Sequence, residues 1–188
     1  MVRVLVTAVL LATTTLASAQ HAQPYAGLEQ RPVKALSDQQ IADLRSGRGM
    51  GLALAAELNG YPGPLHVLEH AQALRLTPEQ RQRTQALYDA MKAETIPLGE
   101  RLIAEEAGLD RAFAERTITP QVLANATDAI GRTQGALRAA HLRYHLTQLE
   151  VLTPEQAKRY AELRGYAGAE HRMHGASPSH QPGMHHGR

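Results

Sequence analysis

Leu76-Thr77-Pro78-Glu79-Gln80 occurs a second time as Leu152-Thr153-Pro154-Glu155-Gln156, with the same five residues in the same order. In each copy Thr suits the N-cap of a helix, Pro suits the first helical position, and Gln is placed to complete a capping box. The two pentapeptides therefore predict two helix starts, and the pattern around them decides the fold.

Two long amphipathic segments lie between the copies. The first has apolar residues near the coiled-coil period of 3.5, with Pro97 expected to kink it, and the second begins at Thr119-Pro120. Only the short connector of residues 115–118 separates them, so the two helices are predicted to lie antiparallel as a hairpin. The apolar positions are Leu87, Met91, Leu98, Leu102, Leu109 and Phe113 in the first segment and Leu123, Ala126, Ile130, Thr133, Leu137, Ala140 and Tyr144 in the second.

Shorter helices are expected on both sides of the hairpin. Ser37 with Gln40 forms a further capping box, residues 64–76 read as a helix, and a final helix carries Tyr160 and Leu163. Strand signals are absent, so the predicted fold class is all-α: an antiparallel helical hairpin with short flanking helices. Because a hairpin two helices thick cannot bury all its apolar faces, we expect pairing into a cradle-like dimer or a higher homo-oligomer. The apolar side expected for the helix of residues 64–76 consists of Leu65, Leu68, Ala71 and Leu74.

The 188 residues divide into four predicted parts. Residues 1–19 read as a signal peptide, because Arg3 precedes a short apolar run and a small-residue end, and that run is too short to span a bilayer. Residues 20–36 read as a flexible lead-in, residues 37–165 as the helical domain, and residues 166–188 as a disordered tail. The chain is therefore expected to be a soluble exported protein without a membrane anchor.

Composition excludes several classes of function. The chain has no Cys, which excludes disulfides, thiolate metal sites and cysteine nucleophiles. Its 20 basic and 18 acidic residues nearly balance, so the sequence predicts no basic surface stripe that would bind nucleic acid. The sequence has neither a nucleophile elbow nor the strands that would hold one, so we expect that the protein is not an enzyme. His66-Val67-Leu68-Glu69-His70 spells the inverted zinc-protease motif, but a chain so poor in aromatic residues offers little to build a peptide cleft.

Four of the ten histidines form two helical pairs, His66 with His70 and His141 with His145. Imidazoles four residues apart on a helix can reach one ion, and zinc takes four ligands, so each pair supplies about half a site. A helical wheel places the second pair between apolar neighbours and the first pair away from its own apolar side. The competing interpretations are interior imidazoles for the second pair and solvated ones for the first. If both pairs converge, the residues available to complete the shell are Glu69, Asp89 and Glu94.

Five more histidines lie in the tail, in a segment rich in Gly, Ser and Pro. Imidazoles and thioethers on a flexible tether suit capture of zinc, copper or nickel, with Met favouring Cu(I). The competing interpretation is a solubilising tail. The ligand candidates there are His171, His174, His180, His185 and His186, with Met173 and Met184 nearby.

The two pentapeptides are copies of an LTxxQ motif. Together with the predicted signal peptide, helical pattern and His-rich tail, they make residues 37–165 resemble the Spy/CpxP-type periplasmic family, which includes zinc-resistance-associated proteins and heavy-metal sensors. The resemblance implies a curved hairpin paired into a cradle, and either ATP-independent holding of unfolded proteins or metal binding linked to envelope stress.

Two functions follow as hypotheses. The first is a periplasmic protein that binds a divalent metal ion, zinc before copper or nickel, for sensing, buffering or resistance. The alternative is an ATP-independent chaperone that holds unfolded clients, with an envelope sensor as a further partner. Basic residues beside the Leu stripe would supply its mixed contact surface: Arg81, Arg83, Arg101 and Arg111.

Overall fold

The computed structural model describes residues 25–166, and the part of the chain it describes is helical, without strands. A 3-10 turn, Leu28–Gln30, is followed by α1 (Asp38–Ser46), α2 (Leu54–Glu57), α3 (Pro64–Glu69), α4 (Pro78–Ala114), α5 (Pro120–Leu149) and α6 (Pro154–Leu163). The predicted signal peptide, residues 1–19, lies outside the described residues, and so does the predicted tail apart from Tyr166.

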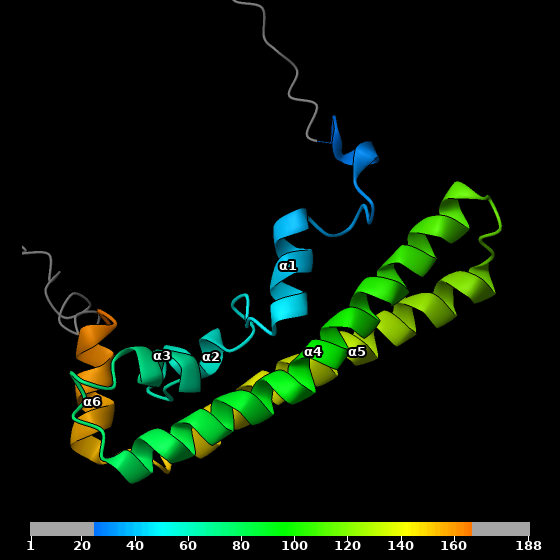
Figure 1. Cartoon of the computed structure of the whole chain (residues 1–188). Helices are drawn as coiled ribbons and strands as arrows, with labels where there is room; N and C mark the ends of the chain where they lie inside the picture. Colours follow the sequence, from blue (N-terminus) through cyan, green and yellow to red (C-terminus); the bar gives the residue numbers. More distant parts are fainter. Residues whose placement is uncertain (1–24, 167–188) are drawn as a thin grey trace, which may run out of the picture.

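The long helices α4 and α5 lie side by side as an antiparallel hairpin (Figure 1). Helices α1, α2 and α3 follow one side of the hairpin, and α6 lies across the end where α4 begins and α5 finishes (Figure 1). The all-α hairpin with short flanking helices is thus confirmed, while the dimer stays a prediction. Helix α4 continues through Pro97 without ending.

The contact between the two helices differs from the predicted leucine seam. Leu87, Leu98 and Leu109 are only half-buried and Phe113 is 53% exposed, whereas Thr84 and Thr95 are fully buried. A threonine is tolerated inside because its hydroxyl can bond within the helix, as the Thr95 Oγ1 does by donating to the Met91 carbonyl at 2.8 Å. On α5 the predicted stripe is buried at Ile130, Thr133, Leu137 and Ala140.

A close crossing of α1 over α4 explains part of this shift. At Gly99 an added Cβ would lie 2.6 Å from the Leu44 carbonyl oxygen, so only glycine lets the two backbones approach. Ile41 and Leu44 of α1 pack there with Leu102 and Ile103 of α4.

The two pentapeptides pack against each other at the end of the hairpin. All three predicted capping boxes form, at Ser37, Thr77 and Thr153. In addition, Gln80 Nε2 donates to Gln156 Oε1 at 2.7 Å, and Gln156 Nε2 donates to Gln80 Oε1 at 2.9 Å. We call this reciprocal arrangement the glutamine pair, and the end of the hairpin that holds it the paired end.

The glutamine pair also binds backbone groups on both sides. Gln80 donates to the Val151 carbonyl at 2.9 Å and Gln156 to the Leu74 carbonyl at 3.2 Å. The fifth residue of each motif therefore caps its own helix and joins the start of α4 to the start of α6.

Two predictions about the flanking segments were wrong in detail. Helix α3 ends at Glu69 rather than at Leu76, and Val67, not Leu65 or Leu68, is its most buried apolar residue. The chain turns after Glu69, and Leu74 then lies in a second apolar cluster at the paired end. That cluster consists of Val67, Leu74, Leu152 and Tyr160, with Leu76, Leu163 and Tyr166 against it.

Part of the predicted lead-in belongs to the folded body. Val33 is 5% exposed and Leu36 is 8% exposed, and both pack in the cluster that holds α1 on the hairpin. The prolines interrupt regular structure without preventing these two side chains from reaching the core. Residues 20–24 lie outside the described part.

Candidate functional site

The second histidine pair lies inside the protein, on the face of α5 that meets the flanking helices. His141 is 2% exposed, His145 is 7% exposed, and Gln148, one turn further, is fully buried. The wheel prediction that this pair lies between apolar neighbours is confirmed.

His145 is held by the loop before α3. Its Nδ1 lies 2.7 Å from the Tyr61 carbonyl oxygen, and because a carbonyl can only accept, Nδ1 carries the proton and donates. The ring also lies against Gly63, where an added Cβ would be 2.8 Å from Cε1. His145 therefore joins α5 to the start of α3.

A buried carboxylate, Glu57 of α2, lies next to this histidine. Glu57 is 6% exposed, and its Oε2 is 3.7 Å from His145 Nδ1. Its other oxygen, Oε1, accepts from the Tyr160 hydroxyl at 2.5 Å, from Arg164 Nε at 3.2 Å and from the Tyr166 hydroxyl at 3.1 Å. Three donors from α6 and the residues after it thus converge on one carboxylate of α2.

This Glu57 cluster is the feature that sequence reasoning missed. The only signal was an acidic residue within the mostly apolar stretch of residues 52–58. The three residues that donate to Glu57 lie more than a hundred residues later, so no local pattern could name them. Burial raises the pKa of Tyr160, with the hydrogen bond to Glu57 adding to the effect, and Tyr160 therefore stays protonated as a donor.

His141 is in a different state from a solvated imidazole. Burial, followed by the charge of nearby His145, lowers the pKa of His141 to about 4, so its ring is neutral at neutral pH. Its Nε2 is buried without a hydrogen-bond partner among the described residues. A neutral imidazole nitrogen of this kind is chemically suited to a metal ion, but only if further donors can approach it.

The first histidine pair lies nearer the surface. The side chain of His66 is 35% exposed, and its Nδ1 is 2.8 Å from Glu69 Oε2. A carboxylate accepts, so Nδ1 donates and Nε2 keeps its lone pair, which is how second-shell carboxylates prepare histidine ligands.

His70 does not face away from the apolar side as predicted. Because α3 ends at Glu69, the His70 ring packs edge to face on Tyr160, with the ring centroids 6.3 Å apart. His66 therefore lies near the surface beside Glu69, whereas His70 lies against the apolar cluster of the paired end.

The structure does not bring the two pairs together into a metal site. Within residues 25–166, no three His, Asp or Glu side chains are grouped so that they could hold one ion. The residues considered for the shell have other partners, because Glu69 contacts His66, Asp89 accepts from Gln85 and Glu94 accepts from Arg143. The candidates His171, His174, His180, His185 and His186 lie outside the described residues.

Comparison with known families adds to this geometry. A family of heavy-metal resistance proteins matches residues 49–159, which is more than half of the chain. The chain belongs to this heavy-metal resistance family. The matched region runs from the loop before α2 into α6 and so contains the hairpin, both pentapeptides and both histidine pairs. The family assigned from the LTxxQ motifs is confirmed.

Two further comparisons gave no result: neither the search of curated proteins nor the search of solved structures found a match. None of the helices in the described part combines the length and the hydropathy that a bilayer crossing requires.

Proposed function

We propose that this protein is a non-catalytic periplasmic metal-binding protein of heavy-metal resistance, and that its C-terminal histidines capture the ion. Membership of the family supports a link to heavy metals. Five imidazoles and two thioethers within residues 171–186 suit zinc, copper or nickel, and we place zinc first.

The proposal rests on one observation: the four histidines of residues 25–166 lie in separate surroundings and do not form one group. His145 is engaged with Tyr61, His141 is buried, His70 packs on Tyr160, and only His66 is partly exposed with an oriented ring. Since zinc takes four ligands, residues 25–166 as arranged fit at most part of a site. The C-terminal segment is therefore the main source of ligands.

The test is calorimetric titration of the chain from residue 20 onward with zinc, copper and nickel. One variant replaces all five C-terminal histidines by Gln, and the matched control replaces the two buried ones, His141→Gln and His145→Gln. We expect the first variant to lose most binding and the second to keep it. Unchanged stoichiometry and affinity in the first variant would contradict the proposal.

A second function is favoured by one specific observation, the exposed apolar residues where the hairpin turns. Phe113 is 53%, Val122 41% and Leu123 40% exposed. We call this region the turn end, and we propose that it holds unfolded clients without ATP. A second subunit could cover the same apolar residues, and this contact is the competing interpretation. An envelope sensor protein is a further proposed partner.

Suppression of client aggregation separates these roles. A chaperone should act at near-equimolar ratio without metal, and Phe113→Ser with Leu123→Ser should weaken that action. Leu146→Ser is the control, because Leu146 is 54% exposed but lies far along α5 from the turn. Equal suppression by all three proteins would overturn the assignment of the turn end.

A further inference from the structure

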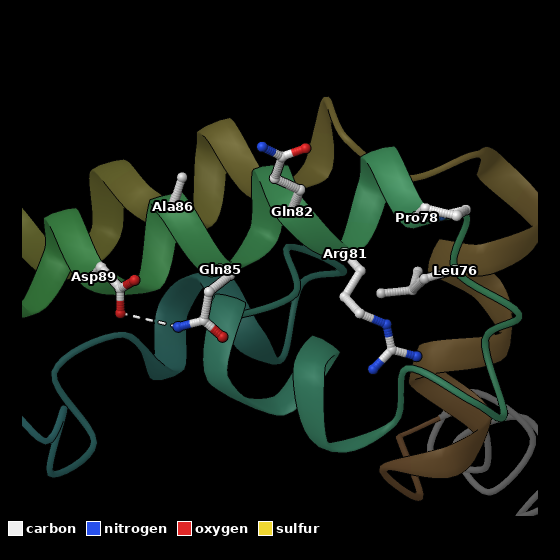
Figure 2. A pocket seen from close by; sticks show the side chains of 7 residues that line it. All are labelled: Leu76, Pro78, Arg81, Gln82, Gln85, Ala86 and Asp89. Atoms are coloured by element: carbon white, nitrogen blue, oxygen red, sulfur yellow. Dashed lines mark hydrogen bonds between the residues drawn. The ribbon is translucent and has the colours of Figure 1, made fainter.

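A groove of about 730 Å³ follows the outer face of the first turns of α4, close to the paired end. Figure 2 shows Arg81, Gln85 and Asp89 along one side of the helix. Gln85 lies between the two charged residues, and its Nε2 donates to Asp89 Oδ1 at 2.9 Å. The rest of the lining is uncharged and consists of Leu76, Pro78, Gln82 and Ala86.

Neither charge of this groove has an ion-pair partner in the single chain. Arg81 is exposed and, like Asp89, makes no salt bridge within residues 25–166. The two residues lie about 12 Å apart along the helix axis, at 1.5 Å per residue, so they do not pair with each other. Asp89 can still accept further bonds, because a carboxylate has two oxygens and only one of them accepts from Gln85.

The order of these residues is self-complementary about Gln85. Arg81 lies four residues before Gln85 and Asp89 four residues after it, so each is about 6 Å from it along the axis. If two such helices lie antiparallel with Gln85 beside Gln85, the Arg81 of each is level with the Asp89 of the other. A parallel pair would set like charges at the same level. The groove therefore complements a second copy of itself related by a twofold axis.

The face that carries the groove is open to another helix. Its residues recur every three or four positions, which places them along one side of α4. The exposed residues on this side are Pro78, Gln82, Ala86, Asp89 and Ala93. Thr84 and Met91 lie on the buried side of the same helix. The two alanines leave room for a second helix to approach, so its side chains can enter the groove.

We propose that a second copy of this chain docks here, with the two α4 helices antiparallel across Gln85. Arg81 of each chain pairs with Asp89 of the other, and the two Gln85 amides meet at the twofold axis. One helix face buries less than the roughly 800 Å² per partner that stable complexes bury, so the contact is weak and reversible, with a dissociation constant in the micromolar range.

This contact gives the dimer expected from the sequence a definite surface near the paired end. Because the two α4 helices run in opposite directions, the two turn ends project away from each other and stay uncovered. They are then free to hold clients, and this consequence alone rests on the chaperone function proposed above. The docking itself requires neither a client nor a metal ion, so its test is independent of both proposed functions.

The chain has no Cys, so a single introduced cysteine tests the register. In the chain from residue 20 onward, Gln85→Cys places two thiols at the axis, and a mild oxidant should link the two chains. The matched control is Ala93→Cys, which is exposed on the same face but lies about 24 Å from its counterpart, beyond the roughly 7 Å between Cα atoms that a disulfide spans. We expect linkage at least tenfold faster in the first variant. Equal rates would overturn the antiparallel register.

Charge reversal tests the ion pairs, with sedimentation equilibrium as the measurement and circular dichroism to verify folding. Arg81→Glu and Asp89→Arg each set like charges opposite one another, so each should raise the dissociation constant at least tenfold. The double variant should restore association, and so should an equimolar mixture of the two single variants, because every contact again joins opposite charges. Arg83→Glu is the control, since Arg83 is exposed but lies off this face and should leave association unchanged.

Three results would overturn the proposal. The first is a parent chain that stays monomeric at high micromolar concentration. The second is reversed variants that neither the double substitution nor the mixture restores. The third is association that survives Arg81→Glu but is lost in Phe113→Ser with Leu123→Ser, which would place the second copy at the turn end. Failure of client holding or of metal binding would overturn the proposed functions and leave these measurements intact.

Discussion

The two ends of the hairpin are built from the same two helices but are completed differently. At the paired end, the glutamine pair, the Glu57 cluster and the cluster around Tyr160 satisfy both polar and apolar groups. At the turn end, Phe113 and Leu123 remain exposed and the chain reverses with Arg116 in the left-handed region. Local stability is therefore expected to be high at one end and low at the other.

This difference teaches what the repeated pentapeptide contributes. A Thr-Pro start is enough to begin a helix, because α5 begins at Pro120 after the N-cap Thr119 and has no Gln to complete a capping box. The copies at Gln80 and Gln156 do more, because each amide also bonds the other and a carbonyl of the neighbouring segment. The motif therefore joins helices as well as starting them.

The largest effect is expected from removal of the buried carboxylate. Glu57→Ala leaves the Tyr160 hydroxyl without its acceptor and Arg164 without its ion pair, so we expect a loss of about 3 kcal/mol in the free energy of unfolding. Urea denaturation measures it. The control is Glu115→Ala at the turn end, where an exposed side chain should change stability by less than about 0.5 kcal/mol. Similar losses in both variants would remove the contrast between the two ends.

The glutamine pair should give the next largest effect. Gln80→Ala removes both bonds to Gln156 and leaves the Val151 carbonyl without its side-chain donor in a half-buried place. It also removes the Gln80 half of the capping box, so we expect about 2 kcal/mol of destabilisation. The double variant with Gln156→Ala should cost less than the sum of the two, by about 1 kcal/mol. Gln121→Ala is the turn-end control, since Gln121 makes only an exposed bond to Asn125. Strict additivity would show that the amides act separately.

The sequence predicted those parts of the fold that depend on local pattern. Capping residues marked helix starts at Ser37, Thr77 and Thr153. The period of the apolar residues predicted which face of α5 is buried, and it also predicted the interior position of His141. The seam predicted for α4 was right at Met91 and Leu102 but wrong at Phe113. It also missed Gly99, where a backbone crossing, rather than side-chain hydropathy, decides the contact.

The candidate site was predicted only in part, for a related reason. Spacing placed two imidazoles on one helix face in each pair, but the partners of those rings come from elsewhere in the chain. The Tyr61 carbonyl holds His145, and Tyr160 receives His70 after α3 has ended. Such pairings depend on tertiary contacts between distant segments, which no local pattern encodes.

Acid should weaken the protein through His141. Its pKa is lowered from 6.5 to about 4 in the folded state, so folding favours the neutral ring. The stabilisation is complete above pH 6.5 and is lost as the pH falls toward 4, about 2 kcal/mol between pH 7.5 and pH 5. Urea midpoints across that range measure it, and His141→Gln should flatten the dependence. An equal slope in that variant would assign the effect to another group.

Two glycines sharpen the comparison between covered and open helix surface. Gly99→Ala forces a Cβ against the Leu44 carbonyl and should cost about 2 kcal/mol. Gly135→Ala on α5 meets nothing within 4 Å and should instead stabilise by about 0.5 to 1 kcal/mol, because alanine favours helix. Thermal unfolding of both variants shows the opposite signs. Destabilisation by Gly135→Ala would indicate that a second chain covers this surface.

The smallest effect on the folding of one chain is expected at the turn end. Phe113→Ser with Leu123→Ser removes side chains that are already largely exposed, so unfolding at low protein concentration should change by less than about 1 kcal/mol. If this end forms the proposed subunit contact, the melting temperature of the parent protein rises with concentration and that of the variant does not. If it holds clients instead, neither melting temperature depends on concentration and only aggregation suppression is lost. Concentration-dependent melting that survives the double substitution would place the subunit contact on another surface of the hairpin.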